Sequence, residues 1–420
     1  MSEITRLWRI GAVVLCLALC ALTQSAVAAE PIKIGFSMSL TGAVANTGRV
    51  ALAAQKLWES DVNAHGGLLG RPVQLVYYDD QSNPANVPSI YTKLLDVDKV
   101  DLVVGPYSTV QTAPAMATVI EHGMVFVGLS AININSQFHY QKYFSMTNGG
   151  PRPTDAFSAG FLAVALQQSP KPQTIALLGA DNEFAQNVLD AARHNATDAG
   201  LKIVYDRTYP PATVDYSPII RAVQAAGPDI VYLASYPQDS VGLVRAVNEI
   251  GYKPKMIGGA TVGLNNVSNK MQLGPLLNGI VGYENWLPVS TLDFPGIEDV
   301  LHRYQAEAKT EGLDPLGYGM VPSAYAQLQI LGVAVAATGS LDQDKIAQYL
   351  HSHPVQTVWG DLTFGADGEW SDGRVLVVQY HDITGKTLDQ FTDPAKMTVL
   401  DPAKFKSGTL IYPFANAVKE

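Results

Sequence analysis

Short runs of apolar, strand-forming residues alternate along this chain with longer segments in which apolar residues recur at helical spacing. IKIGFSMSL (32–40) predicts a strand, the next segment predicts a helix that ends at Gly66-Gly67, and PVQLVYYD (72–79) predicts another strand. Strands separated by single helices pair in parallel, because each crossover helix returns the chain to the same edge of the sheet. The alternation therefore predicts an α/β fold with parallel sheets.

The pattern starts again after PRPTDAF (151–157), with strands predicted at 173–180, 229–235 and 254–260. The two series are similar in size, although they are not a tandem sequence repeat. A chain of 420 residues is also too long for one simple core. We therefore predict two sequential α/β units of the Rossmann-like kind.

The last third of the chain departs from this alternation. It leaves the second unit at 279–288, and the apolar segment 324–339 predicts a buried helix. RVLVVQYHD (374–382) predicts a strand, and the tail after Phe391 is expected to be irregular. No low-complexity linker separates the two units, so we expect several strand-like crossings to join them.

Composition narrows the class of protein. Apolar residues make up 47% of the chain and charged residues 16%, which argues against disorder. The formal net charge is −10 without a basic block, whereas nucleic-acid binding needs a clustered basic surface. We therefore expect no nucleic-acid partner.

The first 29 residues have the features of a secretory signal peptide. Arg6 and Arg9 precede an apolar segment (10–22), and AVA (26–28) provides small residues for cleavage. The apolar segment is short for a membrane span, although an uncleaved anchor is the alternative. The sequence predicts a signal peptide at 1–29 and a mature protein exported to the periplasm.

Both cysteines of the chain, Cys16 and Cys20, fall inside this predicted signal. The mature chain is therefore expected to have no disulfide and no thiolate metal site. It contains no GxxxxGK[ST], HExxH or GxSxG motif. Asp79-Asp80 is a conspicuous acid pair, but adjacent residues of a strand point to opposite faces. We expect no enzyme activity, no metal and no cofactor.

Hydroxyl groups follow directly after one predicted strand. In LVVGPYSTVQTAPAM (102–116) the apolar run is expected to end at Gly105-Pro106, and Tyr107, Ser108 and Thr109 come next. Ligands of open α/β sheets bind beyond the carboxyl ends of the strands, where a helix N-terminus offers free N–H groups to an anion. The stretch predicts a carboxylate-binding site, and simple N-capping by one hydroxyl is the alternative.

Five stretches in order along the chain share a recognisable pattern, and the most specific is VNAHGGLLGRPVQLVYYDD. The stretches are IKIGFSMSLTG (32–42), 61–84, VVGPYSTVQTAPA (103–115), GADNEFAQN (179–187) and 215–251. Together they resemble the Leu/Ile/Val-binding protein family, whose members are solute-binding subunits of ABC importers with the type I periplasmic-binding fold. The resemblance covers nearly the whole mature chain.

The resemblance implies two lobes that enclose a ligand, a hinge of three crossings, a monomer, and an ABC permease in the inner membrane as transient partner. The crossings would lie near 145–150, 283–287 and 355–362. The N-terminal lobe would comprise 30–147 plus 286–355, the C-terminal lobe 148–285 plus 356–395, and a C-terminal tail 396–420.

The resemblance also implies a set of ligand-binding positions. Two of them depart from the family pattern, because Ile132 replaces a threonine and Ala260 replaces an acid that contacts the ammonium of amino-acid ligands. Tyr107 and Trp286 are added because, with Phe184 and Tyr236, they would enclose the apolar part of a ligand, and ordinary packing within a lobe is the alternative for each aromatic. The full set is Asn46, Thr47, Tyr107, Ser108, Thr109, Ser130, Ala131, Ile132, Phe184, Tyr236, Ala260 and Trp286.

These two departures favour a small organic carboxylate without an amine, because a buried ammonium without a counter-charge is costly. A branched-chain amino acid is the alternative, if Asp181, Glu183 or Asp239 replaces the missing acid. Two other functions stay open: a periplasmic sensor that reports to a receptor kinase, and a periplasmic hydrolase, which would need a nucleophile and a base in the cleft.

Overall fold

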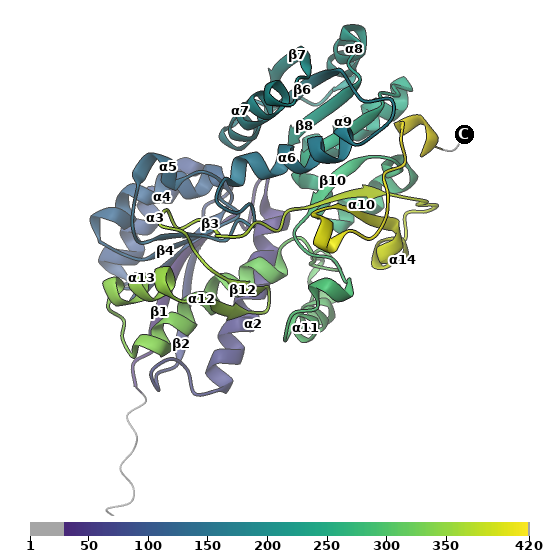
Figure 1. The fold of residues 1–420 in the computed structure, drawn as a ribbon. Coiled ribbons are helices and arrows are strands. Elements are labelled where there is room, and N and C mark those ends of the chain that lie inside the picture. Colours follow the sequence, from purple (N-terminus) through teal and green to yellow (C-terminus); the bar gives the residue numbers. More distant parts are fainter. Residues whose placement is uncertain (1–28, 419–420) are drawn as a thin grey trace, which may run out of the picture.

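A computed structural model describes residues 29–418, so the predicted signal peptide lies almost wholly outside the described residues. Two β-sheets lie toward opposite ends of the molecule, with the chain crossing between them (Figure 1). The first sheet is parallel throughout, in the order β2-β1-β3-β4-β5. Its strands are β1 Ile32–Met38, β2 Val73–Asp79, β3 Leu102–Tyr107, β4 Phe126–Leu129 and β5 Tyr143–Ser145.

Helices cover this sheet, and local sequence signals set where several of them begin or end. The long helix α2 is followed by Gly66 and Gly67, both with positive φ, as the sequence predicted. Asn83 accepts a hydrogen bond from the Ala85 N–H ahead of α3. The helices are α2 Ala45–Ala64, α3 Val87–Thr92, α4 Thr109–Glu121, α5 Asn135–Phe138, α11 Ile297–Glu311, α12 Val321–Thr338 and α13 Gln343–Ser352.

The second sheet repeats the strand order of the first. Its parallel part, β7-β6-β8-β9-β10, matches β2-β1-β3-β4-β5 strand for strand, and β13 and β14 extend it in antiparallel fashion. The strands are β6 Thr174–Ala180, β7 Lys202–Tyr209, β8 Ile230–Ser235, β9 Met256–Thr261, β10 Val281–Glu284, β13 Leu376–Tyr380 and β14 Met397–Asp401. The helices are α6 Pro153–Leu166, α7 Glu183–Asp198, α8 Ser217–Ala226, α9 Pro237–Ile250, α10 Val267–Leu273 and α14 Asp389–Thr392.

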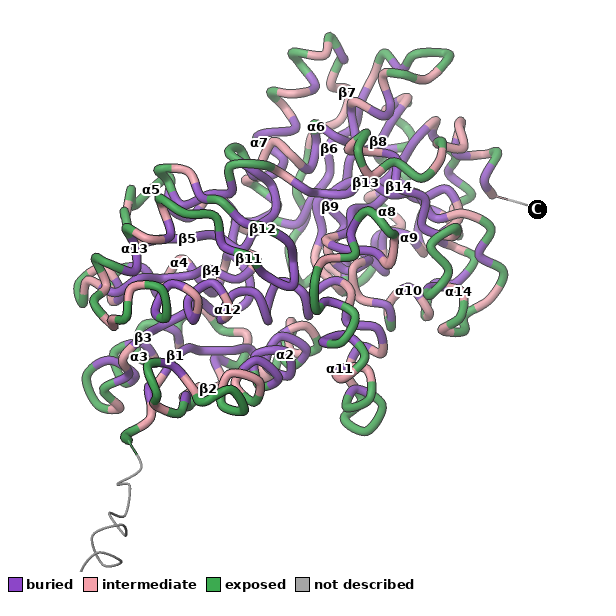
Figure 2. The backbone as a smooth tube through the Cα atoms, turned by 60° about the horizontal axis from the view of Figure 1, so that its bottom comes forward, coloured by how far each residue is buried: buried purple, intermediate pink, exposed green. Residues whose placement is uncertain are grey.

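The strands of both sheets are buried, while exposed residues concentrate in the outer loops (Figure 2). Helix α12 is mostly buried, as its sequence predicted, and packs against α2, α13 and β4. Within the described residues it is the one helix long and apolar enough to cross a membrane, but 72% of it is enclosed by the fold. Its apolar composition is therefore explained by burial in the core.

Strand β3 does not end at Gly105-Pro106, contrary to the sequence-based expectation. It continues to Tyr107 through a register shift against β4 between Val104 and Tyr107. Gly105 is required there, because an added Cβ would lie 2.9 Å from the Gly128 Cα. The irregularity turns the carbonyl of Gly105 toward Gln327, whose Nε2 donates to it at 3.0 Å.

The tail is also more regular than expected. Residues 397–401 form β14, which pairs with β13, so part of the segment that we assigned to a separate tail belongs to the second sheet. Its burial explains the difference, because Met397 and Val399 are fully buried. The strand is only five residues long and lies at a sheet edge, where a sequence pattern is weak.

The chain passes between the sheets three times. The first two crossings, at 146–152 and 285–296, lie close to the expected positions. The third was expected at 355–362, but those residues form the hairpin β11 Val355–Thr357 and β12 Gly360–Leu362. The hairpin packs on α12, and Trp370 Nε1 donates to the carbonyl of Ser145 on β5 at 2.8 Å. The third crossing is therefore 371–375, and 356–370 lie with the first sheet.

The crossings are hydrogen-bonded to one another. The Arg374 N–H donates to the Asn148 carbonyl at 2.6 Å, and Asn148 Nδ2 donates to the Arg374 carbonyl at 3.1 Å. The Arg374 guanidinium donates to the Trp359 carbonyl, and Trp359 Nε1 donates to the Asn285 carbonyl in the second crossing. Arg374 thus connects the first crossing directly and the second through Trp359.

Candidate functional site

One pocket lies between the carboxyl ends of the two sheets, where the repeated strand order places a switch point in each. It has a volume of about 780 Å³, including solvent at its mouth. The lining residues are Thr47, Val50, Tyr107, Ser108, Ser130, Ile132, Met146, Thr147, Asn148, Phe157, Phe184, Tyr236, Val262, Asn265, Asn266, Tyr283, Asn285, Asp314, Gly317, Gly319 and Met320.

The structure brings together seven of the twelve residues that the sequence singled out. These are Thr47, Tyr107, Ser108, Ser130, Ile132, Phe184 and Tyr236. The other five do not line this pocket: Asn46, Thr109, Ala131, Ala260 and Trp286.

Each of the five has another environment. Asn46 is exposed on α2, and Ala131 and Ala260 are buried in the core. Thr109 is buried and its Oγ1 accepts a hydrogen bond of 3.1 Å from the Ile132 N–H, so this hydroxyl supports the neighbouring loop. Trp286 donates from Nε1 to the Leu292 carbonyl at 2.7 Å.

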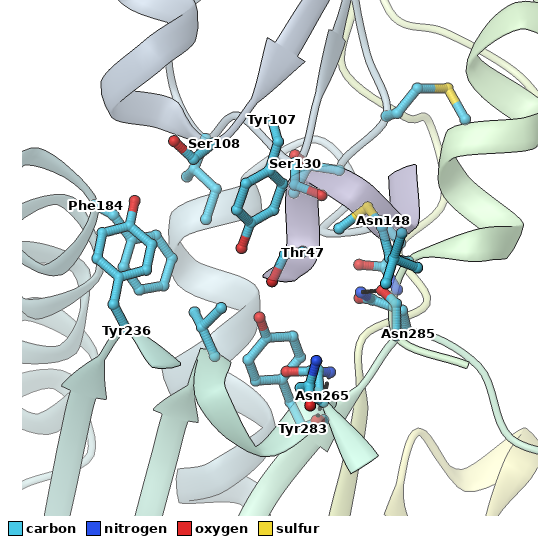
Figure 3. A pocket seen from close by; sticks show the side chains of 18 of the residues that line it. Thr47, Tyr107, Ser108, Ser130, Asn148, Phe184, Tyr236, Asn265, Tyr283 and Asn285 are labelled. Carbon is cyan, nitrogen blue, oxygen red and sulfur yellow. Dashed lines mark hydrogen bonds between the residues drawn. The ribbon is translucent and has the colours of Figure 1, made fainter. Parts of the chain in front are cut away.

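The N-terminus of α4 borders the pocket as an uncapped helix end. Ser108 is the N-cap residue, but its side chain makes no capping hydrogen bond, and the first turn has no acidic residue. Within the described chain, the N–H groups of residues 109–111 have no backbone partner, and Thr112 makes the first return bond, to the Ser108 carbonyl. Together with the hydroxyls of Ser108 and Ser130, this end favours an anion (Figure 3).

Two aromatic rings form one side of the pocket, and we call them the aromatic pair. Phe184 lies in the first turn of α7 and Tyr236 immediately precedes α9, so both follow carboxyl ends of second-sheet strands. Their ring centroids are 5.2 Å apart with an interplanar angle of 30° (Figure 3). Phe157 packs edge-on against Phe184 and holds that ring in place. Such a surface suits a flat or branched apolar group.

Three hydroxyls, those of Thr47, Tyr107 and Tyr283, point toward the middle of the pocket (Figure 3). Burial raises the pKa of Tyr107 to about 12, with the Thr47 hydroxyl opposing the shift. Burial also raises the pKa of Tyr283 well above the ordinary tyrosine value. Both phenols are therefore neutral at physiological pH and can donate or accept a hydrogen bond.

The only charged side chain among the lining residues is Asp314, and its carboxylate is already occupied. Oδ2 accepts from the N–H groups of Val267 and Ser268, at 2.5 and 3.2 Å. Oδ1 accepts from those of Leu316 and Gly317, at 3.2 and 2.8 Å. Burial raises the pKa of Asp314 and these N–H groups oppose the shift. This side chain joins the start of α10 to the loop that follows α11.

The three acids proposed as substitutes for the missing one lie elsewhere. Asp181 is exposed and accepts from Gln186. Glu183 is half-buried, and burial raises its pKa. Asp239 is buried and accepts a 2.6 Å hydrogen bond from the Tyr209 hydroxyl, and burial raises its pKa to about 6. None of the three lines the pocket.

Sequence reasoning missed the amide side chains of the pocket. Asn148 and Asn285 lie in the first and second crossings, and Asn265 follows β9 (Figure 3). Asn266, the next residue along the chain, also lines the pocket. The sequence did contain a signal for Asn148 and Asn285. Crossings were expected at 145–150 and 283–287, and a polar residue in a crossing borders the cleft between the lobes. Across residues 29–418, no group of three His, Cys, Asp or Glu side chains is suited to a metal ion.

Comparisons with known proteins agree with this geometry. The profile of the family described as periplasmic binding protein matches residues 31–382. The leucine-, isoleucine-, valine-, threonine- and alanine-binding protein of Pseudomonas aeruginosa is 23% identical over 372 residues, covering 88% of this chain and 95% of that protein.

Solved structures share the fold. The branched-chain amino acid transporter substrate-binding protein of Streptococcus pneumoniae, in complex with isoleucine, has a TM-score of 0.72 at 19% identity, covering 89% of this chain and 100% of that one. An ABC transporter solute-binding protein of Rhodopseudomonas palustris, in complex with p-hydroxybenzoic acid, has a TM-score of 0.72 at 18% identity, covering 85% and 94%. Because the family profile matches residues 31–382, far more than half of the chain, this chain belongs to the periplasmic binding protein family.

Proposed function

We propose that this protein is the solute-binding subunit of an ABC importer and captures a small organic carboxylate that lacks an amine. One observation carries the proposal: the pocket offers donors for an anion, while the single acid in its lining, Asp314, already accepts four backbone hydrogen bonds. A carboxylate would bind at the N-terminus of α4, and its apolar body would lie against the aromatic pair.

The charge argument separates this ligand class from amino acids. An ammonium group transferred from water into a pocket without a free counter-charge loses its hydration at a cost of several kcal/mol. A carboxylate at the uncapped end of a 13-residue helix regains hydrogen bonds from N–H groups and hydroxyls. The lining therefore favours an acid over a zwitterion.

A branched-chain amino acid is the second candidate. The Pseudomonas aeruginosa relative is named for such ligands, and the amides of Asn148, Asn265 and Asn285 provide neutral acceptors that could partly replace a carboxylate. In that case the ammonium would be bound by amide and carbonyl oxygens alone.

The remaining parts of the proposal follow from the family. The signal-like segment 1–29 would direct export, so the mature protein would act in the periplasm as a monomer and pass its ligand to an inner-membrane ABC permease. We infer that it is not an enzyme. A role as the ligand-binding part of a sensor would use the same pocket, and the genes beside this one would distinguish a permease from a receptor kinase.

A thermal-shift screen of the ligand-stripped mature protein tests the ligand class. Leucine, valine, phenylalanine, benzoate, phenylpropenoate, keto acids and short amides would each be added at about 1 mM. A micromolar binder then stabilises the protein by roughly 4 kcal/mol, which raises Tm by roughly 2–4 °C per kcal/mol. A shift with acids alone supports the proposal, and a shift with leucine or valine alone overturns it. Recovery of chemically unchanged ligand argues against catalysis.

A further inference from the structure

The orientation of the Asn265 amide in the pocket is determined by its neighbours. Nδ2 donates to the Tyr283 carbonyl at 3.1 Å and to Glu284 Oε2 at 3.4 Å. The Tyr283 carbonyl can only accept, and Glu284 is held as a carboxylate by its ion pair with Lys270, so an amide turned by 180° would place Oδ1 against two oxygens. The nitrogen therefore faces β10, and Oδ1 is the atom that Asn265 can offer to a ligand.

The acceptors that hold Nδ2 are themselves fixed. Glu284 is fully buried at the end of β10, and its Oε1 forms an ion pair with the buried Lys270. The Tyr283 carbonyl belongs to the same strand, which pairs with β9 and β13. Because both acceptors are fixed within the second sheet, a bound ligand would not turn the Asn265 amide around.

Asn265 Oδ1 is buried and has no hydrogen-bond partner in the part of the chain that the structure describes. The Tyr236 hydroxyl also lines the pocket and is buried without a hydrogen-bond partner among residues 29–418. Buried polar atoms are normally paired, and an exception in a binding pocket indicates a partner supplied from outside the chain. Oδ1 can only accept, so the ligand must bring a donor.

We propose that the ligand is a hydroxyl-bearing aromatic acid whose hydroxyl donates a hydrogen bond to Asn265 Oδ1. This rests on the proposed function and adds a second polar group to the acid described there. The donor is neutral, because an ammonium would need a carboxylate to accept its hydrogen bonds, and four backbone N–H groups already occupy the acceptor sites of Asp314. The ring is assigned from the aromatic pair, whose two rings provide an apolar aromatic surface on one side of the pocket.

Calorimetric titration of the mature protein with matched acids tests the donor directly. The probes are 4-hydroxybenzoate, 3-hydroxybenzoate, benzoate, and the two methoxybenzoates, in which the oxygen can accept but not donate. At least one hydroxy acid should bind about tenfold or more tightly than benzoate and than its own methoxy analogue, as one hydrogen bond to a buried acceptor provides. Equal binding of all five acids would overturn the hydroxyl assignment and leave the proposed function standing.

Two variants identify the acceptor. Asn265→Leu removes Oδ1 and should abolish the hydroxyl preference, so that in this variant each hydroxy acid binds no more tightly than its methoxy analogue. Asn248→Leu is the matched control, because that amide also donates to two backbone carbonyls, those of Val244 and Leu276, yet lies outside the pocket. A hydroxyl preference that persists in Asn265→Leu would contradict the role of Asn265.

The outcomes separate the two proposals. If none of the acids binds and leucine does, the proposed function fails together with this inference. If Asn265→Leu does not fold, the comparison of hydroxy and methoxy acids on the unmodified protein still decides whether a donor is required.

Discussion

The side-chain amide of Gln327 donates hydrogen bonds to the carbonyls of Gly105 at 3.0 Å and Val127 at 2.7 Å. These carbonyls belong to neighbouring strands, at the point where the register of β3 against β4 shifts. Gln327 also accepts from Gln55 on α2, at 2.8 Å. The fully buried Gln327 side chain thus binds the two carbonyls that the register shift leaves without a strand partner. Gly105 lies two residues before Tyr107, which lines the pocket.

Replacement of Gln327 by leucine should therefore destabilise the fold. It leaves two buried carbonyls and the Gln55 amide without partners, which we expect to cost about 2–4 kcal/mol in the free energy of unfolding. Urea denaturation measures this cost. Gln348→Leu, at an exposed position of α13, is the control and should change stability by less than about 0.5 kcal/mol. Equal stability of the two variants would show that the β3 irregularity needs no such support.

The overall fold could be predicted from the sequence because its strands and helices have clear periodicity and glycine signals, as at Gly66-Gly67 and Gly251. The sequence-based predictions were wrong where contacts between distant parts of the chain determine the local structure. The bulge at Gly105 depends on Gln327, which lies 222 residues away. Likewise β14 is a strand because β13 provides an edge for it, and its own five residues carry little pattern.

The candidate site was partly predictable for the same reason. Residues placed directly after strands, such as Ser108 and Tyr236, line the pocket as expected. Thr109 does not line the pocket although it is adjacent to Ser108, because its hydroxyl, in the first turn of α4, accepts a hydrogen bond from the Ile132 N–H. Asp314 lies in a loop and Asn265 ends the short 3-10 helix after β9, and the spacing of residues along the chain does not reveal that both segments reach the pocket.

The hinge offers a second prediction, which concerns Arg374. Its guanidinium lies 4.9 Å from the ring centroids of both Phe294 and Trp370 and donates to the Trp359 carbonyl. Burial lowers its pKa to about 10, so it remains charged at neutral pH. Lysine cannot reproduce the planar stacking, and Arg374→Lys should lose about 1–3 kcal/mol of stability.

Thermal and urea unfolding of Arg374→Lys would measure this loss, with Arg221→Lys on the exposed face of α8 as the control. We also expect the variant to open more readily, which small-angle scattering would detect as a larger radius of gyration without ligand. An unchanged stability would mean that the backbone hydrogen bonds to Asn148 alone join the crossings.

A third prediction concerns pH. Glu369 is buried beside β5, its Oε2 has no hydrogen-bond partner in residues 29–418, and burial raises its pKa to about 8. In the unfolded chain the group loses its proton near pH 4, so between these values the folded state holds one more proton. Stability should therefore fall as pH rises toward 8, by up to about 1.4 kcal/mol per pH unit.

Glu369→Gln removes this titration and should flatten the dependence of Tm on pH between 6 and 8. This window lies above the pKa of about 6 for Asp239, another buried acid whose pKa is raised by burial. Glu249→Gln, on the exposed side of α9, should keep the slope of the unmodified protein. If Glu369→Gln keeps that slope as well, Glu369 does not titrate in this range.

A fourth prediction separates a structural role of Asp314 from a ligand-binding one. Asparagine can satisfy only one of the two pairs of N–H donors and turns its own NH₂ toward the other, so Asp314→Asn should cost about 2–4 kcal/mol of stability. Acid affinity should change less than about threefold at a temperature where the variant is folded. Asp293→Asn, at an exposed position, is the control. Selective loss of leucine binding would instead identify Asp314 as the partner of an ammonium.

The fifth prediction follows from the backbone of Ser108, which has a φ of 85° at the start of α4. A residue with a Cβ is strained in this conformation by about 1–3 kcal/mol, whereas glycine is not. Ser108→Gly should therefore stabilise the protein, by less than that strain because glycine also gains entropy in the unfolded chain. Ser108→Ala keeps the strain and should leave stability almost unchanged.

Both Ser108 variants remove the hydroxyl at the anion-binding end of the pocket and should weaken acid binding by about tenfold, as loss of a hydrogen bond to a charged group does. Thermal unfolding without ligand and calorimetry with the acid separate the two effects. Ser136→Ala, at an exposed position whose hydroxyl donates to the Asn133 carbonyl, controls for loss of a serine hydroxyl. If glycine and alanine at 108 retain full affinity, the N–H groups of α4 bind the carboxylate without the hydroxyl, and the strain at Ser108 serves no purpose in ligand capture.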